Sequence, residues 1–257
     1  MTHYPLSVRN HPRSVIALLV TPVVFFLAGC SASKLPRLGL PEPVTDNGHR
    51  TLALWQGSWV AALIVGAFVW GLIVWAIIFH RRRGEHVPAQ TKYNVPIEIL
   101  YTIIPFLIVA VLFYFTARDE SVITKISPKG TAVHVIHVNG IRWSWQFKYE
   151  DLPANTVVTG TPDHIPTLYL PVGERVRFDL TTTDVNHSFW VPAFLMKMDL
   201  IAGRTNQFEV TPDKLGTYAG KCAELCGRDH SRMLFNVKVV PPAEYNQLLN
   251  TLKGSAA

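Results

Sequence analysis

Two long apolar runs constrain the fold of this chain more than any other feature of its sequence. Residues 59–79 contain no charged side chain, and residues 97–116 contain only Glu98. An α-helix rises about 1.5 Å per residue, so each run is long enough to cross the hydrocarbon core of a bilayer. The sequence therefore predicts a membrane protein with a transmembrane helical hairpin within residues 55–118.

The loop between the two runs is short and basic. It carries His80-Arg81-Arg82-Arg83 and, further on, Lys92. Because short basic loops remain on the cytoplasmic side, we expect both ends of the mature chain on the outer face. From residue 119 onward 14 basic residues balance 14 acidic ones, so the net charge of +6 comes from the first 118 residues. This distribution excludes a basic nucleic-acid-binding domain.

The N-terminus has the pattern of a signal peptide. Arg9 and Arg13 precede an apolar stretch that is too short to span a bilayer. The next residues, Leu27-Ala28-Gly29-Cys30, resemble a bacterial lipobox, in which the cysteine becomes the lipidated first residue. We therefore expect a signal peptide at residues 1–29, a lipidated Cys30, an exported leader at 30–54 and a bacterial plasma-membrane location. The alternative is a free cysteine at the end of an uncleaved anchor.

Beyond residue 119 the pattern changes to short β-like runs separated by turn residues. Val176, Phe178 and Leu180 alternate with charged residues, as in a strand with one buried face. Residues 119–257 are therefore expected to form an exported all-β domain, an antiparallel sandwich or barrel of about seven to nine strands. The runs are residues 131–138, 141–149, 167–170, 174–182, 205–210, 217–221 and 234–240, and residues 243–253 are expected to form a short helix.

A loop between the last two runs concentrates side chains that bind metals. Cys222, Cys226, His230 and Met233 supply two thiols, an imidazole and a thioether. Thiolate and thioether are soft ligands that select copper, zinc or iron–sulfur clusters, and imidazole suits copper and zinc. The loop therefore predicts a metal site at one end of the β-domain.

Three interpretations of this loop compete. A disulfide between Cys222 and Cys226 suits an oxidising compartment but leaves His230 and Met233 unexplained. Structural zinc prefers a closed Cys/His tetrahedron, in which Met is a poor ligand. A mononuclear blue copper site uses a single Cys, so the second Cys favours two copper ions that share both thiolates. Such a centre requires a second imidazole from outside the loop.

His187 is the candidate for the second imidazole. It follows the strand expected to end near Thr182, where a turn can approach another end loop of a sandwich. His134, His137 and His164 are weaker candidates, for which surface or packed positions are the better expectation.

With these residues the chain resembles subunit 2 of the haem–copper cytochrome c oxidases, over nearly its whole length after the signal peptide. The resemblance rests on two transmembrane helices, the aromatic segment around Trp143, and a loop spacing specific to the dinuclear copper A centre. It implies a membrane-anchored α+β chain with a cupredoxin domain. The copper ligands it implies are the thiolates of Cys222 and Cys226, the imidazoles of His187 and His230, the thioether of Met233 and the backbone carbonyl of Glu224.

The resemblance also implies a function. The chain would accept electrons from cytochrome c and pass them to haem in subunit 1, where oxygen is reduced to water with proton translocation. Subunits 1 and 3 would be its partners. Trp143 matches the position of electron entrance, whereas core packing is the better expectation for Trp145. The side chain of Glu224 matches a residue that binds magnesium or manganese at the boundary with subunit 1, and Asp199 and Arg204 match residues of that boundary.

Two acidic residues receive further roles from the resemblance. Glu98 matches a glutamate at the entrance of a proton channel, whereas its position alone is equally compatible with a side chain that reaches the membrane surface. Asp184 matches a residue of an acidic docking face for cytochrome c.

The charge of the β-domain departs from that of mitochondrial relatives. The domain is neutral by count, and Arg228 and Arg232 lie beside the expected ligands, so steering of a basic cytochrome should be weak. We therefore expect a donor that is membrane-tethered or part of a neighbouring complex. The chain has no Cys-x-x-Cys-His, so it carries no fused haem c. A copper store is disfavoured because the chain has only four Met. A quinol oxidase subunit would lack the copper ligands, whereas here the ligand set is complete. A nitrous-oxide reductase is a soluble enzyme, so the transmembrane hairpin disfavours it.

Overall fold

The computed structural model describes residues 35–255, except residues 83, 86, 129, 130, 132, 154 and 155. The chain divides into two units, residues 1–40 and 41–257. In the first unit, Leu35–Arg37 forms the 3-10 helix η1. The expected signal peptide and Cys30 lie outside the described residues.

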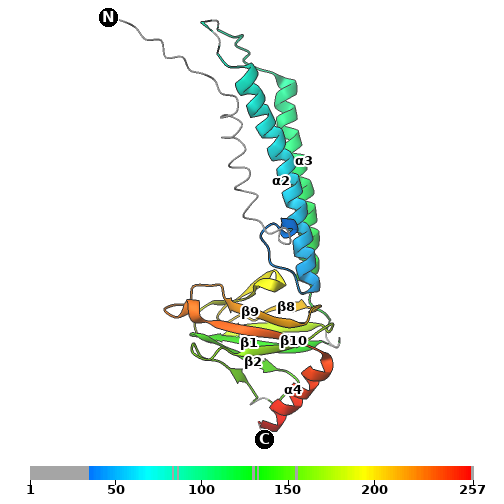
Figure 1. Cartoon of the computed structure of the whole chain (residues 1–257), viewed down its shortest axis with the longest axis vertical. Helices are drawn as coiled ribbons and strands as arrows, with labels where there is room; N and C mark the ends of the chain where they lie inside the picture. The colour runs from blue at the N-terminus through cyan, green and yellow to red at the C-terminus, as the bar shows by residue number, and fades with distance from the viewer. Residues whose placement is uncertain are drawn as a thin grey trace, which may run out of the picture. The chain divides into compact units, whose positions relative to one another are not determined.

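Two long helices of the second unit run side by side (Figure 1). α2 spans Asp46–Phe79 and α3 spans Val95–Ile123, and both are long and apolar enough to cross a membrane. Both extend beyond the apolar runs. α2 begins within the expected leader, at Asp46 rather than near Trp59, and α3 continues past Thr116.

The early start of α2 has a local cause. Thr45 is the N-cap residue, and its hydroxyl accepts a hydrogen bond from Gly48 N at 3.1 Å. The Asp46 carboxylate suits the positive end of the helix dipole, and it accepts a hydrogen bond from Thr211 N of the β-domain at 2.9 Å. The first turn of α2 is therefore attached to the β-domain.

The remaining chain forms a β-sandwich with ten strands among the described residues. One sheet has the order β3-β2-β1-β5-β8 and the other β4-β10-β9-β6-β7. The strands are β1 His134–Ile141, β2 Ser144–Tyr149, β3 Val158–Thr159, β4 Thr167–Pro171, β5 Val176–Thr182, β6 His187–Val191, β7 Met196–Leu200, β8 Asn206–Val210, β9 Gly216–Cys222 and β10 Leu234–Val240. The short helices are η2 Pro192–Phe194, η3 His230–Arg232 and the C-terminal α4 Pro242–Ser255.

The sandwich and its terminal helix confirm the expected fold class, but two details were wrong. The sheets are mixed, because β1 pairs with β5 and β4 pairs with β10 in parallel. The strands exceed the expected number because β3, β6 and β7 were not foreseen.

An aromatic core joins the two sheets beneath the metal loop. Trp145 of β2 meets Phe235 of β10 with ring centroids 5.1 Å apart, and Phe189 of β6 stacks on Phe235 at 4.7 Å. Phe178, in the strand with predicted alternation, is fully buried and contacts Phe189. Burial of each such side chain contributes about 1.5–3 kcal/mol. The metal loop, the segment from Cys222 to Met233, is therefore built on a rigid, well-packed base.

Candidate metal centre

Pairing of β6 with β9 brings two distant segments of the sequence together. Phe189 lies opposite Cys222 in this antiparallel pair. Side chains two apart on a strand share a face, so His187 lies on the same side of β6 as Phe189. His187 is the first residue of β6 rather than part of a turn, and it is fully buried.

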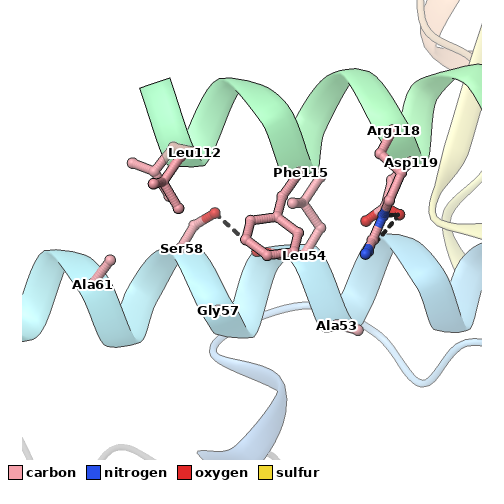
Figure 2. A pocket seen from close by; sticks show the side chains of 10 residues that line it. Ala53, Leu54, Gly57, Ser58, Ala61, Leu112, Phe115, Arg118 and Asp119 are labelled. Atoms are coloured by element: carbon pink, nitrogen blue, oxygen red, sulfur yellow. Dashed lines mark hydrogen bonds and ion pairs between the residues drawn. The ribbon is translucent and has the colours of Figure 1, made fainter. Parts of the chain in front are cut away.

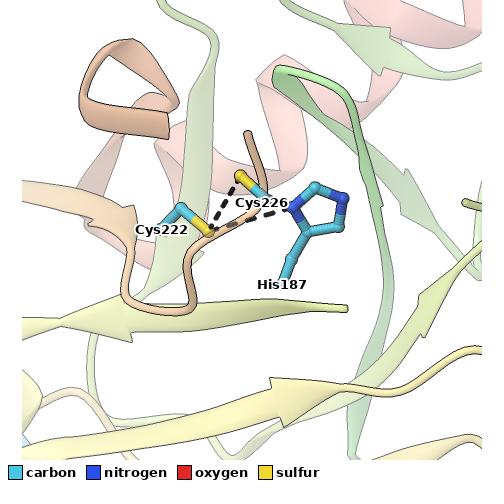
Figure 3. A group of neighbouring side chains, drawn as sticks. All are labelled: His187, Cys222 and Cys226. Atoms are coloured by element: carbon cyan, nitrogen blue, oxygen red, sulfur yellow. Dashed lines mark hydrogen bonds between the residues drawn. The ribbon is translucent and has the colours of Figure 1, made fainter. Parts of the chain in front are cut away.

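Three ligand-type side chains meet at this point (Figure 3). Cys222 Sγ lies 3.9 Å from His187 Nδ1 and 3.9 Å from Cys226 Sγ. The three ligand atoms lie within 4.8 Å of one another, and all three residues are buried. This geometry makes them a candidate metal site.

The other predicted ligands surround the same sulfurs. Cys226 Sγ lies 3.5 Å from His230 Nδ1 and 3.8 Å from the Met233 thioether sulfur. The backbone oxygen of Glu224 lies 3.3 Å from Cys222 Sγ, whereas its side chain is exposed. Each cysteine sulfur therefore has its own imidazole nitrogen.

The two cysteines are free thiols in this structure. Their sulfurs are 3.9 Å apart, well beyond the length of about 2.05 Å of a disulfide bond. Burial raises the pKa of Cys222, but hydrogen bonds to His187 and the backbone outweigh it and lower the pKa to about 7. Burial and the charge of Cys222 raise the pKa of Cys226. A bound cation would therefore be needed to hold both residues as thiolates.

Asp184 orients the imidazole of His187. Its Oδ1 lies 2.9 Å from His187 Nε2, so the other ring nitrogen is turned toward the sulfurs. Burial raises the pKa of Asp184, but hydrogen bonds from His187 and from the amides of Arg142 and Val185 lower it to about 2. Such carboxylate–imidazole pairs are typical of metal sites. Since only 20% of its side chain is exposed, Asp184 contributes little to the expected acidic docking face.

The two tryptophans of the aromatic segment differ in their surroundings. Trp143 is half-buried, and its Nε1 donates a hydrogen bond to Cys226 O at 3.1 Å. Trp145 is fully buried, which confirms its expected place in the core, and its Nε1 donates to Met233 O at 3.3 Å. Both rings therefore hold the backbone of a ligand residue.

The surface near Trp143 is rich in arginine. The Arg228 guanidinium lies 5.5 Å from the Trp143 ring centroid, and 83% of its side chain is exposed. Half of the Arg142 side chain is also exposed, whereas the nearby Asp229 carboxylate is mostly buried. Cations are therefore more accessible than carboxylates beside Trp143.

The remaining site residues of the sequence analysis lie apart from the cluster. Glu98 is in the first turn of α3, where its Oε1 accepts a hydrogen bond from Asn94 N at 2.9 Å. Asp199 lies in β7, and Arg204 in the loop that follows. The weaker histidine candidates have other partners: His134 pairs with Glu174, His137 lies near Asp179, and the backbone of His164 bonds with that of Thr161.

Two contacts that support His187 were not foreseen from the sequence, one from Asp184 and one from Gly140. Asp184 precedes His187 by three residues, a spacing that could have signalled the hydrogen bond. Gly140 lies against the ring, because a Cβ there would be 2.9 Å from His187 Cδ2. A glycine inside a strand is a known signal of such close approach.

The fold and the donor set together define a membrane-anchored cupredoxin with a site for soft metal ions. The model of a family described as cytochrome C oxidase subunit II, periplasmic domain, matches residues 134–240. The probable cytochrome c oxidase subunit 2 of Streptomyces avermitilis is 50% identical, over 93% of this chain and 87% of that protein. The cytochrome c oxidase subunit 2 of Mycobacterium tuberculosis is 32% identical, over 91% of this chain and 80% of that protein.

A similar solved structure is the periplasmic domain of subunit II of cytochrome oxidase of Bradyrhizobium japonicum. It is 31% identical, covers 51% of this chain and 100% of its own, and has a TM-score of 0.45. On the strength of the sequence relatives, this chain belongs to the cytochrome c oxidase subunit 2 family.

Proposed function

We propose that this chain accepts electrons from a cytochrome c at a dinuclear copper centre and delivers them to haem in subunit 1 of the oxidase. Subunit 1 then reduces oxygen to water, coupled to proton translocation. One observation carries the proposal: five ligand-type side chains from separate segments converge at the end of β9. They are His187, Cys222, Cys226, His230 and Met233.

The donor set fits two copper ions better than the alternatives. The site has two cysteine sulfurs 3.9 Å apart, and each has an imidazole beside it. A mononuclear blue copper site uses only one cysteine. The thioether of Met233 disfavours zinc. Two copper ions held by these residues would supply a one-electron acceptor and donor. The backbone carbonyl of Glu224 is positioned to serve as a further ligand.

The chain's own contribution is to keep this ligand set rigid. His187 is fixed by Asp184, Cys222 by the β6–β9 pair, and Met233 by the hydrogen bond from Trp145. A rigid, buried ligand set changes little between two oxidation states, which favours rapid electron transfer. We assign the bond chemistry of oxygen reduction to subunit 1.

We assign the approach of the donor to the surface over Trp143. Trp143 is half-buried, and its hydrogen bond to Cys226 O connects the surface with a ligand residue. The exposed Arg142 and Arg228 beside it would repel a basic cytochrome, so the donor is held close by tethering or by a neighbouring complex.

We assign the departure of the electron to a groove on β6, β7 and β9. It has a volume of about 570 Å³, and its lining includes Trp190, Lys197, Cys222 and His230. Asp199 belongs to the same β7 strand and Arg204 to the loop after it, so this face would contact subunit 1. Glu224 follows Cys222 by two residues, and its exposed side chain is available for a magnesium or manganese ion.

Glu98 is proposed to admit protons to a channel in subunit 1. It lies partly exposed near the end of α3 that joins the basic loop, as a residue at the entrance of a channel would. Its hydrogen bond to Asn94 N gives it a capping role as well.

We propose that the β-domain and both mature termini lie outside the cell, that Cys30 is lipidated, and that subunit 3 completes the complex. The first turn of α2 is attached to the β-domain through Thr45 and Thr211, which supports placing this end of α2 and the β-domain on the same side of the membrane. The basic loop at the other end of the hairpin then lies in the cytoplasm.

The function is tested by single-turnover reduction of the purified oxidase with reduced cytochrome c. His187→Ala should abolish the rapid phase of haem reduction, while a small chemical reductant still reduces the haem. If cytochrome c reduces the haem equally fast in this variant, the proposed route is wrong.

A further inference from the structure

Two hollows lie along the α2–α3 hairpin where it joins the β-domain. The first, of about 380 Å³, lies between the helices and is mostly apolar (Figure 2). Its lining includes Ala53, Gly57 and Ala61 of α2 and Phe115 of α3, with Arg118 at its charged end. This hollow has the character of an acyl-chain groove.

The second hollow is polar and has a volume of about 250 Å³. Its lining includes the basic residues Arg50, Lys125 and Arg175 and the acidic residues Asp46 and Glu209. Residues 50, 54, 57 and 61 repeat at helical spacing along one face of α2, as residues 111, 115, 118 and 122 do along α3. The two hollows therefore follow one another along the same two helix faces.

The carboxylates of this region already have hydrogen-bond donors. Asp46 accepts from the amides of Asn47 and Thr211 at 2.8 and 2.9 Å. Glu209 accepts from the amide and hydroxyl of Ser127 at 3.0 and 2.6 Å. These internal bonds leave the neighbouring cations less fully paired.

Asp119, at the boundary between the hollows, is likewise satisfied. It accepts hydrogen bonds from Arg50 at 3.1 Å and from two nitrogens of Arg118 at 3.0 and 2.9 Å. With its side chain only 4% exposed, it holds both arginines at the place where the apolar hollow ends.

Two cations of the polar hollow keep unused donors. Arg175 lies 3.7 Å from Asp46 and 3.6 Å from Glu209, beyond the usual hydrogen-bond length. Lys125 is exposed and forms no ion pair with any residue that the structure describes. Four basic residues line the two hollows against three acidic ones, which leaves one uncompensated positive charge.

We propose that the two hollows bind one anionic phospholipid. Its phosphate would lie among Arg50, Lys125 and Arg175, and one acyl chain would lie between α2 and α3. The single negative charge of a phosphodiester matches the excess charge of the lining, and basic pockets beside membrane helices suit such headgroups. An apolar helix of another subunit would cover the groove but leave these cations without a counter-charge. This inference depends on the membrane location and not on the copper site.

The test uses the delipidated oxidase that contains the full-length chain, titrated with phosphatidylglycerol or with zwitterionic phosphatidylcholine. Native mass spectrometry that releases single subunits then counts the lipids bound to this chain. Lys125→Gln should weaken phosphatidylglycerol binding about fivefold, the effect of one interfacial cation. Gly57→Leu should weaken it about tenfold, since about two displaced methylene groups account for that factor. A Cβ at Gly57 meets no atom within 4 Å, and Leu favours helices, so this variant should fold.

Matched controls separate this site from general attraction to the membrane. Lys92→Gln removes an exposed charge from the opposite end of the hairpin, and Gly66→Leu adds the same side chain to α2 outside the hollow. One bound phosphatidylglycerol that is lost only in the Lys125 and Gly57 variants supports the proposal. Equal binding of both lipids, or equal losses in the controls, overturns it. Loss of other subunits from Gly57→Leu with unchanged lipid binding also overturns it, because a protein helix would then occupy the groove.

Discussion

The Asp184 carboxylate lies 2.9 Å from His187 Nε2, while Nδ1 of the same ring lies 3.9 Å from Cys222 Sγ. The carboxylate therefore selects the ring nitrogen that faces the metal site.

Asp184→Ala should weaken copper retention about 10- to 100-fold, because His187 loses the partner that orients its ring. Asp184→Asn keeps an oxygen acceptor for His187 Nε2, so it should weaken copper retention less than Asp184→Ala. The measurement is the rate of copper release to a chelator. Glu150→Ala, which removes an exposed acidic side chain outside the metal site, is the control. Equal release rates for Asp184→Ala and the wild type would show that His187 needs no such support.

Gly140→Ala should displace His187 without removing any ligand. The new methyl group would lie 2.9 Å from His187 Cδ2 and 3.0 Å from Leu200 Cδ2, both tighter than ordinary contact. We expect the free energy of unfolding to fall by about 1–3 kcal/mol and copper retention to fall with it. Thermal unfolding and metal analysis measure both effects. Gly71→Ala, where a Cβ meets nothing within 4 Å, should change neither.

The two tryptophans should separate function from stability. Trp143→Phe removes the hydrogen bond to Cys226 O, so it should slow reduction by cytochrome c while lowering the free energy of unfolding by about 1 kcal/mol. Trp145→Ala empties a fully buried site and should lower that free energy by about 3–5 kcal/mol. Stopped-flow reduction and chemical denaturation measure the two effects. The reverse pattern would exclude Trp143 as the electron entrance.

Glu98 has two proposed roles that one pair of variants distinguishes. Glu98→Gln keeps an oxygen that can accept from Asn94 N, so the helix cap survives while the ionisable group is lost. We expect this variant to slow proton-coupled turnover about as much as Glu98→Ala, with an unchanged copper spectrum. Steady-state oxygen consumption is the measurement. Normal turnover of the Gln variant beside a slow Ala variant would leave Glu98 with the capping role alone.

The strands that sequence predicts are those with clear alternation. The burial of Val176 and Phe178 agrees with their period of two. β6 was missed because almost every residue in His187–Val191 is buried, so it shows no alternation. The first turns of α2 were missed because they are polar and are held by Thr45 and the β-domain rather than by apolar periodicity. Such tertiary contacts leave no local pattern in the sequence.

Residue chemistry predicted Cys222, Cys226, His230, Met233 and a second imidazole as candidate ligands, and the structure brings these side chains together. The need for a second imidazole singled out His187, and the structure brings it beside Cys222. The spacing of Asp184 and His187 could have signalled their contact, whereas the neighbours of Gly140 depend on how distant strands pack. Residue types therefore indicated the metal, and the fold supplied the geometry around it.

Electron paramagnetic resonance of the full-length chain, purified in detergent and loaded with copper, tests the central claim most directly. Two copper ions held by Cys222 and Cys226 share one unpaired electron, so the account predicts a seven-line hyperfine pattern. Cys226→Ser should abolish that pattern. A four-line spectrum of the unmodified chain, typical of one copper ion, would contradict the account.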